Sequence, residues 1–323
     1  MITRSWNKSM PKQSFDVLAV GNGCLDIILT GLDGNLNQKP VLYGTQQLVI
    51  PGGGFTTPVV LQRLGAKVTW AADFGNDTIS QFIMKAASDE GVDLSFSRIK
   101  KHEIKRLSVS MSDEVNRSFL SFEDPDPLIP AAFSGMLRVR AKAAYMPGTR
   151  LDWMFLVGAF IARMRKMTII VDGNGSEKYH IEQKMVKRCL KLVDIYLLNT
   201  DEASGLTGKT MPEDALRQLS QYSKLVVLKD GANGAMFING DRCEKIPALP
   251  VSAVDTTGAG DSFNAGFIAA WLKRLPLREC VEWANITAGL STTIPGGATM
   301  KIHLEDILSN VKNYPLAHDG IKS

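Results

Sequence analysis

The residues best suited to chemistry lie in a glycine-rich segment, Asp255 to Ile268, which reads DTTGAGDSFNAGFI. Its first half is small and glycine-rich, whereas Phe263 and Phe267 in its second half recur at helical spacing. A glycine-rich turn that enters a helix exposes several backbone N–H groups at the positive end of the helix dipole, which suits phosphate oxygens. Asp261 falls in the first helical turn beside those donors. Taken alone, it could equally be an acid that only complements the dipole.

Transfer of a phosphoryl group to an alcohol would give this segment a coherent chemistry. The reaction needs a base near the hydroxyl, donors for the developing phosphate charge and a metal ion on the leaving group. Asp261 can be the base, and the amides around Gly258, Ala259 and Gly260 can be the donors. These four residues are therefore candidates for a catalytic centre.

Two further groups of residues fit the same reaction. Asn199 and Glu202 stand one helical turn apart and could hold a hydrated Mg²⁺ ion, which tends to keep its waters. Asp26 could accept hydrogen bonds from two sugar hydroxyls, and Gly53 and Gly54 would let the backbone approach a polar ligand closely. Asn199 and Glu202 could equally be a helix cap with its first-turn acid, and Asp26 a turn former. The occurrence of all these features together favours the functional interpretation.

Alternating strands and helices must position these residues. Short apolar runs predict buried strands, and periodic segments predict helices. In chain order the sequence predicts a strand at 15–20, a helix at 59–64, a strand at 68–72, a helix at 79–90, a strand at 168–171, a helix at 181–192, a strand at 195–198, a helix at 214–222 and a strand at 225–228. This alternation indicates an α/β fold with a mostly parallel sheet and helices on both faces.

Two stretches depart from this alternation. Residues 106–112 and 116–122 each alternate apolar with polar residues, which predicts a hairpin with one face in water. Residues 40–50 could add another strand. The simplest interpretation is a small antiparallel β flap that projects from the core and covers substrate.

The segment 255–268 resembles the second signature of the ribokinase-like (PfkB) carbohydrate and nucleoside kinases. Other motifs of that family follow in the same order over nearly the whole chain, from Phe15 to about Leu308. They are GNGCLD at 21–26, PGGG at 51–54 running to RLG at 63–65, ADFGND at 72–77, NTDE at 199–202, KDGANGA at 229–235, and Asn285 with GGA at 296–298. Each short motif is unspecific by itself, whereas the ordered set is specific.

The resemblance implies a ribokinase-like three-layer αβα sandwich with a mostly parallel central sheet and a small antiparallel β flap, or lid. It implies one kinase domain at 15–323, with lid segments near 38–51 and 104–122, after a flexible extension at 1–14. ATP and Mg²⁺ would be its cofactors, and a small sugar its acceptor. The implied roles are Asp261 as base, Gly258, Ala259 and Gly260 as anion hole, Asp26, Gly53, Gly54 and Thr56 for substrate, Lys229, Gly231, Gly234 and Asn285 for nucleotide, and Asn199 and Glu202 for water-mediated Mg²⁺. The resemblance also allows for a K⁺ site at Asp255 and Thr257 and for homodimers formed through the flap, of which the residues give no independent sign.

Three positions depart from the family pattern. Thr56 stands where an Asn that contacts substrate is common, which leaves the identity of the sugar open. Ser176 stands where the motif D-x-N-x-R has Arg, so a phosphate or sugar-acid contact could be missing. Asn116 replaces the Gly of a G-x-R turn. None of the three touches the expected base, anion hole or N-x-x-E motif.

Composition excludes several other classes of protein. The 323 residues are 45% hydrophobic and 22% charged, which supplies a large core. A net charge of +4 is too small to indicate nucleic acid as the main partner. The longest apolar run, 154–162, is too short to span a membrane, and the first 14 residues lack the apolar region of a signal peptide. Four scattered cysteines indicate reduced thiols in the cytoplasm, and four scattered histidines give no metal-ligand spacing.

Other functions are weighed against a sugar kinase. A nucleoside kinase on the same fold could stack a base on Phe55, Phe119 or Phe122, although flap packing explains these rings as well. A catalytically silent sugar-binding regulator would not need Asp261 beside an anion hole. An NAD oxidoreductase would read Gly21-x-Gly23 as a fingerprint, but Asp26 in its third position would repel a pyrophosphate. A P-loop at 203–210 would require its turn directly after a strand, where a helix is expected instead.

Overall fold

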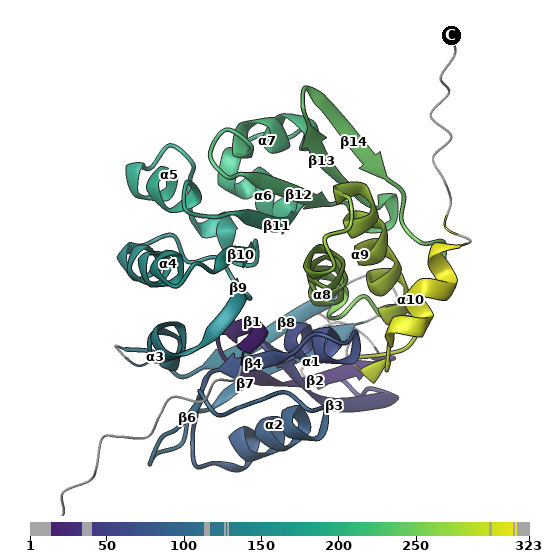
Figure 1. Cartoon of the computed structure of the whole chain (residues 1–323). Helices are drawn as coiled ribbons and strands as arrows, with labels where there is room; N and C mark the ends of the chain where they lie inside the picture. Colours follow the sequence, from purple (N-terminus) through teal and green to yellow (C-terminus); the bar gives the residue numbers. More distant parts are fainter. Residues whose placement is uncertain are drawn as a thin grey trace, which may run out of the picture.

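The computed structural model describes residues 14–33, 41–112, 117–125, 127, 129–296, 299–312 and 314 (Figure 1). Eight strands form one large sheet in the order β14-β13-β12-β11-β10-β9-β1-β4. Six of them are parallel: β1 (Ser14–Val20), β4 (Val68–Ala71), β9 (Arg140–Met146), β10 (Thr168–Asp172), β11 (Ile195–Asn199) and β12 (Leu225–Lys229). The strands β13 (Ala235–Asn239) and β14 (Arg242–Ile246) complete one edge as an antiparallel hairpin.

The central strands β10, β11 and β12 are apolar except at their ends because helices cover both faces of the sheet. One helical layer contains α1 (Thr56–Arg63), α2 (Thr78–Asp89), α8 (Ala259–Leu272), α9 (Leu277–Ser291) and α10 (Leu304–Val311). The other contains α3 (Ala131–Arg138), α4 (Trp153–Met164), α5 (Lys184–Leu190), α6 (Thr200–Thr207) and α7 (Pro212–Leu219). Each layer packs on its own hydrophobic cluster, the first around Trp70 and Phe267 and the second around Phe155 and Tyr196. Figure 1 shows the two layers on opposite sides of the sheet.

A second sheet of four strands lies beside the first and forms the lid. Its order is β3-β2-β7-β8, with β2 at Gly23–Thr30, β3 at Gln46–Gly53, β7 at Arg106–Ser112 and β8 at Arg117–Glu123. The predicted hairpin of β7 and β8 is confirmed, and so is a strand in the other lid segment. The lid is mixed rather than wholly antiparallel, because β2 runs parallel to β7. A short third sheet pairs β5 (Asp73–Phe74) with β6 (Arg98–Ile99).

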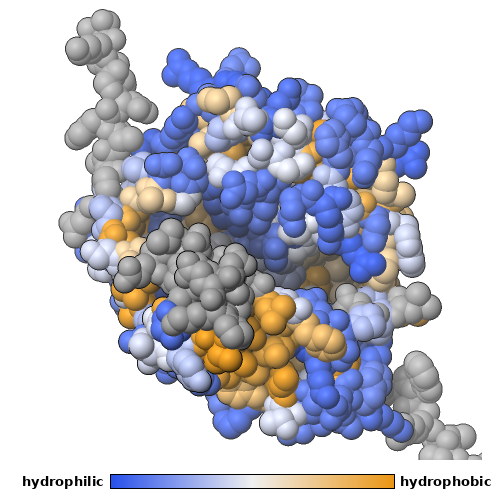
Figure 2. Space-filling view, turned by 180° about the vertical axis from the view of Figure 1, so that it is seen from behind, coloured by the Kyte–Doolittle hydropathy of each residue, from blue (hydrophilic) through white to orange (hydrophobic). Residues whose placement is uncertain are grey.

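One face of the lid is almost wholly apolar. The strand register brings alternate residues together on it: Leu25, Ile27 and Leu29 from β2, Val49 from β3, Leu107, Val109 and Met111 from β7, and Leu120 and Phe122 from β8. Leu120 is 67% exposed and Phe122 is 57% exposed. Figure 2 shows hydrophobic surface gathered over this sheet. We call this surface the outer lid face.

Each strand and helix predicted along the large sheet is confirmed, with ends that differ by a few residues. The largest difference is at α5, which is shorter than the predicted 181–192. The helix α6 directly follows β11, so a P-loop at 203–210 is excluded. Residues 1–13, 34–40 and 113–116 lie outside the described residues, as do Gly297 and Ala298; they include most of the expected N-terminal extension and parts of the expected lid segments. Within the described chain, no helix is long and apolar enough to cross a membrane.

Candidate active site

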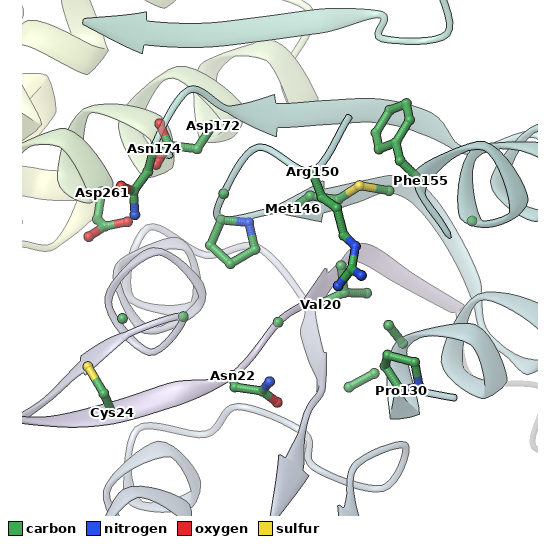
Figure 3. A pocket seen from close by; sticks show the side chains of 18 of the residues that line it. Val20, Asn22, Cys24, Pro130, Met146, Arg150, Phe155, Asp172, Asn174 and Asp261 are labelled. Carbon is green, nitrogen blue, oxygen red and sulfur yellow. The ribbon is translucent and has the colours of Figure 1, made fainter. Parts of the chain in front are cut away.

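A cavity of about 660 Å³ lies at the carboxyl ends of the parallel strands. Ligands of open α/β sheets bind at this edge, because the loops that follow the strands leave a crevice there. Each of the six parallel strands contributes a lining residue at its last position: Val20, Ala71, Met146, Asp172, Asn199 and Lys229. Asn22, Cys24, Gly53 and Gly54 line it from the lid side. Figure 3 shows Asp172, Asn174 and Asp261 together at one end of this cavity.

Asp261 lies in the first turn of α8 and faces the cavity. The helix begins after Gly258, which has a φ of 70°, a left-handed conformation that favours glycine. The pKa of the Asp261 carboxyl is raised to about 7, first by loss of water on burial and then by the negative charge of Asp172, while Lys229 and a hydrogen bond from Thr57 act in the opposite direction. A carboxyl that titrates near neutral pH can exchange a proton with a substrate hydroxyl.

A buried ion pair lies beside Asp261. Lys229 donates from Nζ to Oδ1 of Asp172 over 2.9 Å, and both side chains are about nine-tenths buried. Burial lowers the pKa of the Lys229 ammonium, but the charges of Asp172 and Glu202 more than offset this effect, so its pKa lies above the ordinary value. Lys229 is therefore a permanent cation at the end of β12.

A chain of hydrogen bonds joins Lys229 to Asp261 through the core. Lys229 Nζ lies 3.5 Å from Oδ1 of Asn264, and Asn264 donates from Nδ2 to the Tyr145 hydroxyl over 3.1 Å. Tyr145 Oη lies 3.0 Å from Thr57 Oγ1, which donates to Oδ1 of Asp261 over 3.2 Å. Since an ionised carboxylate only accepts, Thr57 is its donor and Tyr145 must donate to Thr57. Every bond in the chain thus points from the ammonium toward the Asp261 carboxylate.

Asn199 and Glu202 form a reciprocal cap at the start of α6. Asn199 Oδ1 accepts from the Glu202 amide over 2.8 Å, and Glu202 Oε2 accepts from the Asn199 amide over 2.7 Å. Both residues also line the first cavity. The same two residues therefore cap α6 and face the space in which a metal ion is expected. Burial raises the pKa of Glu202, which Lys229 partly counteracts. Among the described residues, no group of three or more His, Cys, Asp or Glu side chains is placed to hold a metal ion. The oxygen atoms of Asn199 and Glu202 are of the kind that Mg²⁺ prefers, beside waters and phosphate oxygens.

Asp26 lies in the middle of β2, on the lid, rather than at a strand end. Cys24 donates from Sγ to Asp26 Oδ1 over 3.1 Å. A Cβ atom on Gly52 would lie 1.8 Å from Asp26 Oδ2, so only glycine leaves room for this carboxylate. Asp26 is not among the lining residues of the cavity, whereas Gly53 and Gly54 are.

Thr56 does not reach the cavity. Its side chain is 5% exposed at the start of α1, and neither of the two cavities described is lined by it. Its neighbour Thr57 instead faces Asp261. The side chain in contact with the expected base is therefore that of Thr57, whereas Thr56 faces neither cavity.

A second cavity of about 520 Å³ lies on the other side of Asp261. It shares three lining residues with the first, Lys229, Gly231 and Gly260, so the two cavities meet where glycines leave space. Of the residues expected on the nucleotide side, Lys229, Gly231, Gly234 and Asn285 all line it. Asn285 Nδ2 lies within hydrogen-bond distance of the main-chain oxygens of Ile246 and Pro247, so its side chain also fixes one wall of this cavity.

The loop before α8 is fixed by Asp255. Its Oδ1 accepts from the amide and the hydroxyl of Thr257, over 2.9 and 2.6 Å, and its Oδ2 accepts from the Gly296 amide over 2.9 Å. The Ala259 amide donates to the main-chain oxygen of Thr256 over 3.2 Å, so it is already engaged. Of the three amides expected to form an anion hole, those of Gly258 and Gly260 belong to residues that line the first cavity.

Four functional neighbours of Asp261 were missed by sequence reasoning: Thr57, Tyr145, Asp172 as the partner of Lys229, and Asn264. Asn264 stands three residues after Asp261 on the same helix, a spacing that could have drawn attention to it. Tyr145 lies on β9, whose sequence RAKAAYM has no β-branched residue and gave no strand signal.

Two cavities that meet beside a carboxylate of raised pKa, at the carboxyl edge of a parallel sheet, define an enzyme that joins two ligands for group transfer. Comparison with known proteins agrees with this class. Residues 16–303 match the model of the family described as pfkB family carbohydrate kinase. The chain therefore belongs to the pfkB family and is an ATP-dependent carbohydrate kinase.

Individual relatives cover most of the chain at low identity. The chain is similar to an ATP-dependent 6-phosphofructokinase of Thermoanaerobacterium thermosaccharolyticum, with 25% identity over 84% of this chain and 85% of that protein. It is similar to a ribokinase of Bacillus subtilis, with 24% identity over 91% and 99%. Its fold matches that of Arabidopsis thaliana ribokinase solved with ribose and ATP, with a TM-score of 0.77, 20% identity and coverage of 93% of this chain and 99% of that chain.

Proposed function

We propose that this kinase transfers the γ-phosphoryl group of ATP to a hydroxymethyl group of a sugar or sugar-like acceptor, with Asp261 as the general base. The proposal rests on one observation: the two cavities meet at Lys229, Gly231 and Gly260. Gly260 directly precedes Asp261 in the chain. The acceptor occupies the first cavity and the nucleotide the second, so that the transferred group crosses the junction.

In the proposed reaction the acceptor hydroxyl gives its proton to Asp261 as its oxygen bonds to the γ-phosphorus. The bond from that phosphorus to the bridging oxygen of ADP breaks, and ADP carries the electron pair away. The amides of Gly258 and Gly260, at the positive end of α8, stabilise the charge of the transferred group. The Lys229 ammonium adds a fixed positive charge at the junction and is held there by Asp172.

Metal ions would serve the nucleotide. Asn199 and Glu202 would hold Mg²⁺ through water, and the ion would neutralise phosphate charge on the leaving group. Asp255 and Thr257 are retained as the candidates for K⁺, although their observed contacts are also explained by the shape of the loop. Gly231, Gly234 and Asn285 line the space proposed for the nucleoside of ATP.

The acceptor is proposed to bind between the lid and the sheet. Gly53 and Gly54 give their backbone to this side of the cavity, and Asp26 on the adjacent strand accepts from sugar hydroxyls when the acceptor is bound. Stacking of a nucleoside base on Phe55, Phe119 or Phe122, the alternative considered from the sequence, finds less support. Phe55 is buried against Trp70, and Phe122 lies on the outer lid face.

The outer lid face supports a homodimer formed through the lid. An apolar sheet face of this kind is stabilised when a second apolar surface covers it. The four cysteines are free thiols, which is compatible with a cytoplasmic location.

A coupled assay of ADP release tests the proposed function. The protein is supplied with Mg²⁺–ATP and a panel of sugars, keto-sugar acids and nucleosides, and Asp261→Asn is run in parallel. We expect turnover on one class of acceptor and a loss of kcat of about 10²–10⁴-fold in the variant. Acceptor binding that is equal in both proteins, without turnover in either, would instead indicate a silent sugar-binding regulator.

A further inference from the structure

A fully buried tyrosine hydroxyl lies in the chain of hydrogen bonds behind Asp261. Tyr145 is on β9, and its side chain has no exposed surface. Its Oη lies 3.0 Å from Oγ1 of Thr57 on α1 and 3.1 Å from Nδ2 of Asn264 on α8. One oxygen atom thus joins the large sheet to two helices, of which α8 carries Asp261.

The Tyr145 side chain is a neutral phenol that has no direct access to a ligand. Burial raises the pKa of Tyr145 well above its ordinary value, and the charges of Asp172 and Asp261 act in the same direction. The phenol therefore keeps one hydrogen to donate. Tyr145 lines neither of the two cavities described. It can consequently affect the reaction only through the residues that it contacts.

The Lys229 ammonium fixes the direction of the hydrogen bonds at Tyr145. An ammonium group only donates, so the side-chain oxygen of Asn264 must face Lys229 and its nitrogen must face Tyr145. The Tyr145 oxygen therefore accepts from Asn264. Within the part of the chain that the structure describes, the oxygen that remains for the hydrogen of Tyr145 is Oγ1 of Thr57.

Thr57 is the residue through which Tyr145 reaches Asp261. The Thr57 hydroxyl has one hydrogen, but it lies 3.0 Å from Tyr145 Oη and 3.2 Å from both the main-chain oxygen and Oδ1 of Asp261. A hydrogen that pointed at Tyr145 would leave the Asp261 carboxylate without this donor. Because Tyr145 donates to Thr57, the hydrogen of Thr57 is directed to Asp261. Thr57 thus occupies Oδ1, which leaves Oδ2 for the hydroxyl of an acceptor.

We propose that Tyr145 is a positioning residue for the base: through Thr57, its hydroxyl fixes the Asp261 carboxylate in the orientation that receives the proton of the acceptor. The inference rests on the proposed function, since it takes Asp261 as the base. Thr57 and Asn264 are fully buried, so loss of the Tyr145 hydroxyl would leave both in need of new partners. A shift of Thr57 moves the carboxylate that it holds, and a misplacement of about 1 Å can cost about a hundredfold in rate.

A second buried tyrosine provides a matched control. Tyr196 on β11 is as fully buried as Tyr145, and its Oη lies 3.0 Å from Oγ1 of Thr149. Thr149 donates to the main-chain oxygen of Asp172 over 2.8 Å, so this pair ends on the backbone rather than on Asp261. Tyr145→Phe and Tyr196→Phe each remove a buried hydroxyl that has a threonine partner. Both should therefore lower Tm by a few degrees.

Steady-state kinetics of the two variants test the proposal. Tyr145→Phe should lower kcat at least tenfold and change KM for acceptor and ATP less than twofold, because neither cavity loses a lining residue. The acid limb of kcat/KM should move up by a few tenths of a pH unit, since the donor to the ionised carboxylate is weakened. Tyr196→Phe should keep kcat within twofold and leave the limb in place. Equal kinetic losses in the two variants, or an unchanged kcat in Tyr145→Phe, would overturn the proposal.

The other ionisable groups that face Asp261 are the same in both variants. They are Asp172 of β10, Lys229 of β12, and Asp26 and Cys24 of β2. A movement of the acid limb in Tyr145→Phe alone is therefore assigned to the hydrogen-bond chain.

A double variant tests whether Tyr145 acts through Thr57. If it does, Tyr145→Phe combined with Thr57→Val should have the kcat of Thr57→Val alone, within twofold. Independent effects would multiply instead, and a multiplied loss would contradict the proposed route.

Titration of the Asp261 carboxyl separates this inference from the kinase mechanism. NMR of protein labelled at the aspartate carboxyl carbons follows its pKa, and the signal that is missing from Asp261→Asn identifies it. If the parent releases no ADP, but Tyr145→Phe raises this pKa and Tyr196→Phe does not, the proposed function fails and the action of Tyr145 on the carboxyl stands. If the parent is an active kinase and Tyr145→Phe changes neither the pKa nor kcat, the inference fails and the kinase mechanism stands.

Discussion

The floor of the first cavity and the lid above it are built from different kinds of backbone. The floor consists of the ends of parallel strands, which two helical layers bury. Its polar side chains therefore bind to partners on rigid, buried elements. The lid is a four-stranded sheet with one apolar face largely uncovered, and much of its contribution to the cavity is glycine backbone. Under the proposed function, this difference assigns the reaction chemistry to the floor and contact with the acceptor to the lid.

The largest effect is expected when the Lys229 cation is removed from the floor, which tests most directly whether floor and lid differ. Lys229→Met leaves the Asp172 carboxylate buried without its ammonium, and loss of one partner of a buried ion pair costs about 3–5 kcal/mol. We also expect kcat to fall at least a hundredfold, because a fixed charge is lost at the junction. Urea unfolding and steady-state kinetics measure the two effects. Lys224→Met is the matched control, since Lys224 is exposed and its pair with Asp194 should contribute at most about 1 kcal/mol. Equal losses of stability in both variants would refute the special position of the floor.

A subtler substitution tests the hydrogen-bond chain. Thr57→Val removes the donor to Asp261 Oδ1, so the pKa of Asp261 should rise further, because this bond favours the ionised form. A hydrogen bond to a charged group contributes about 1.5–3 kcal/mol, and one pKa unit corresponds to about 1.4 kcal/mol. The acid limb of kcat/KM should therefore move up by about one pH unit. Thr287→Val, which removes a buried hydroxyl from α9, should leave the limb in place. An unmoved limb in Thr57→Val would show that the chain does not act on the base.

The pH dependence of stability should depend on the same carboxyl. The pKa of Asp261 is raised from 3.8 to about 7 in the folded protein, so between these values the folded state binds more protons than the unfolded state. Its contribution to stability is complete below about pH 4 and is lost as the pH rises through about 7. Asp261→Asn cannot ionise, so its Tm relative to that of the parent should rise by a few degrees between pH 4 and pH 8. Parallel Tm profiles of the two proteins would contradict the raised pKa.

The smallest effect on chemistry is expected on the lid. Leu120→Glu places a charge on the outer lid face, which should convert a lid-mediated dimer to a monomer while a single-turnover rate at saturating acceptor changes less than twofold. Light scattering after size-exclusion chromatography measures the mass. Leu308→Glu is the control, because Leu308 is an exposed leucine on α10, which is not part of the lid sheet. A parent protein that is already a monomer at micromolar concentration, or one whose dimer survives Leu120→Glu, would count against dimerisation through this face.

The sequence predicted those helices and strands whose own residues form a clear periodic or apolar pattern. Buried strands such as β10 and β11 are mainly apolar runs, and Gly258 and Asp261 mark the start of α8 in the sequence. The strand β9 was missed because its alanines pack well only between neighbouring strands, which a local pattern does not reveal. The hairpin of β13 and β14 did have a local signal, since Gly240-Asp241, with glycine at the first turn position, is a typical two-residue turn.

The candidate site was predictable in its turns but not in its side-chain partners. Gly53, Asn199, Glu202 and Asp261 all line the first cavity as the motifs implied. The partners of Asp261 outside its own helix come from β9, β10 and α1, and no spacing along the chain brings these segments together.

The junction of the two cavities has a consequence for inhibition. Gly231 and Gly260 have no side chains, and Lys229 lines both spaces, so one continuous molecule could occupy the two cavities together. A compound that tethers a sugar to adenosine through a short phosphate bridge would gain binding energy from both sites while losing its translational and rotational freedom only once. Its affinity should exceed that of either half, and the length of the bridge that binds best would measure the distance over which the phosphoryl group travels.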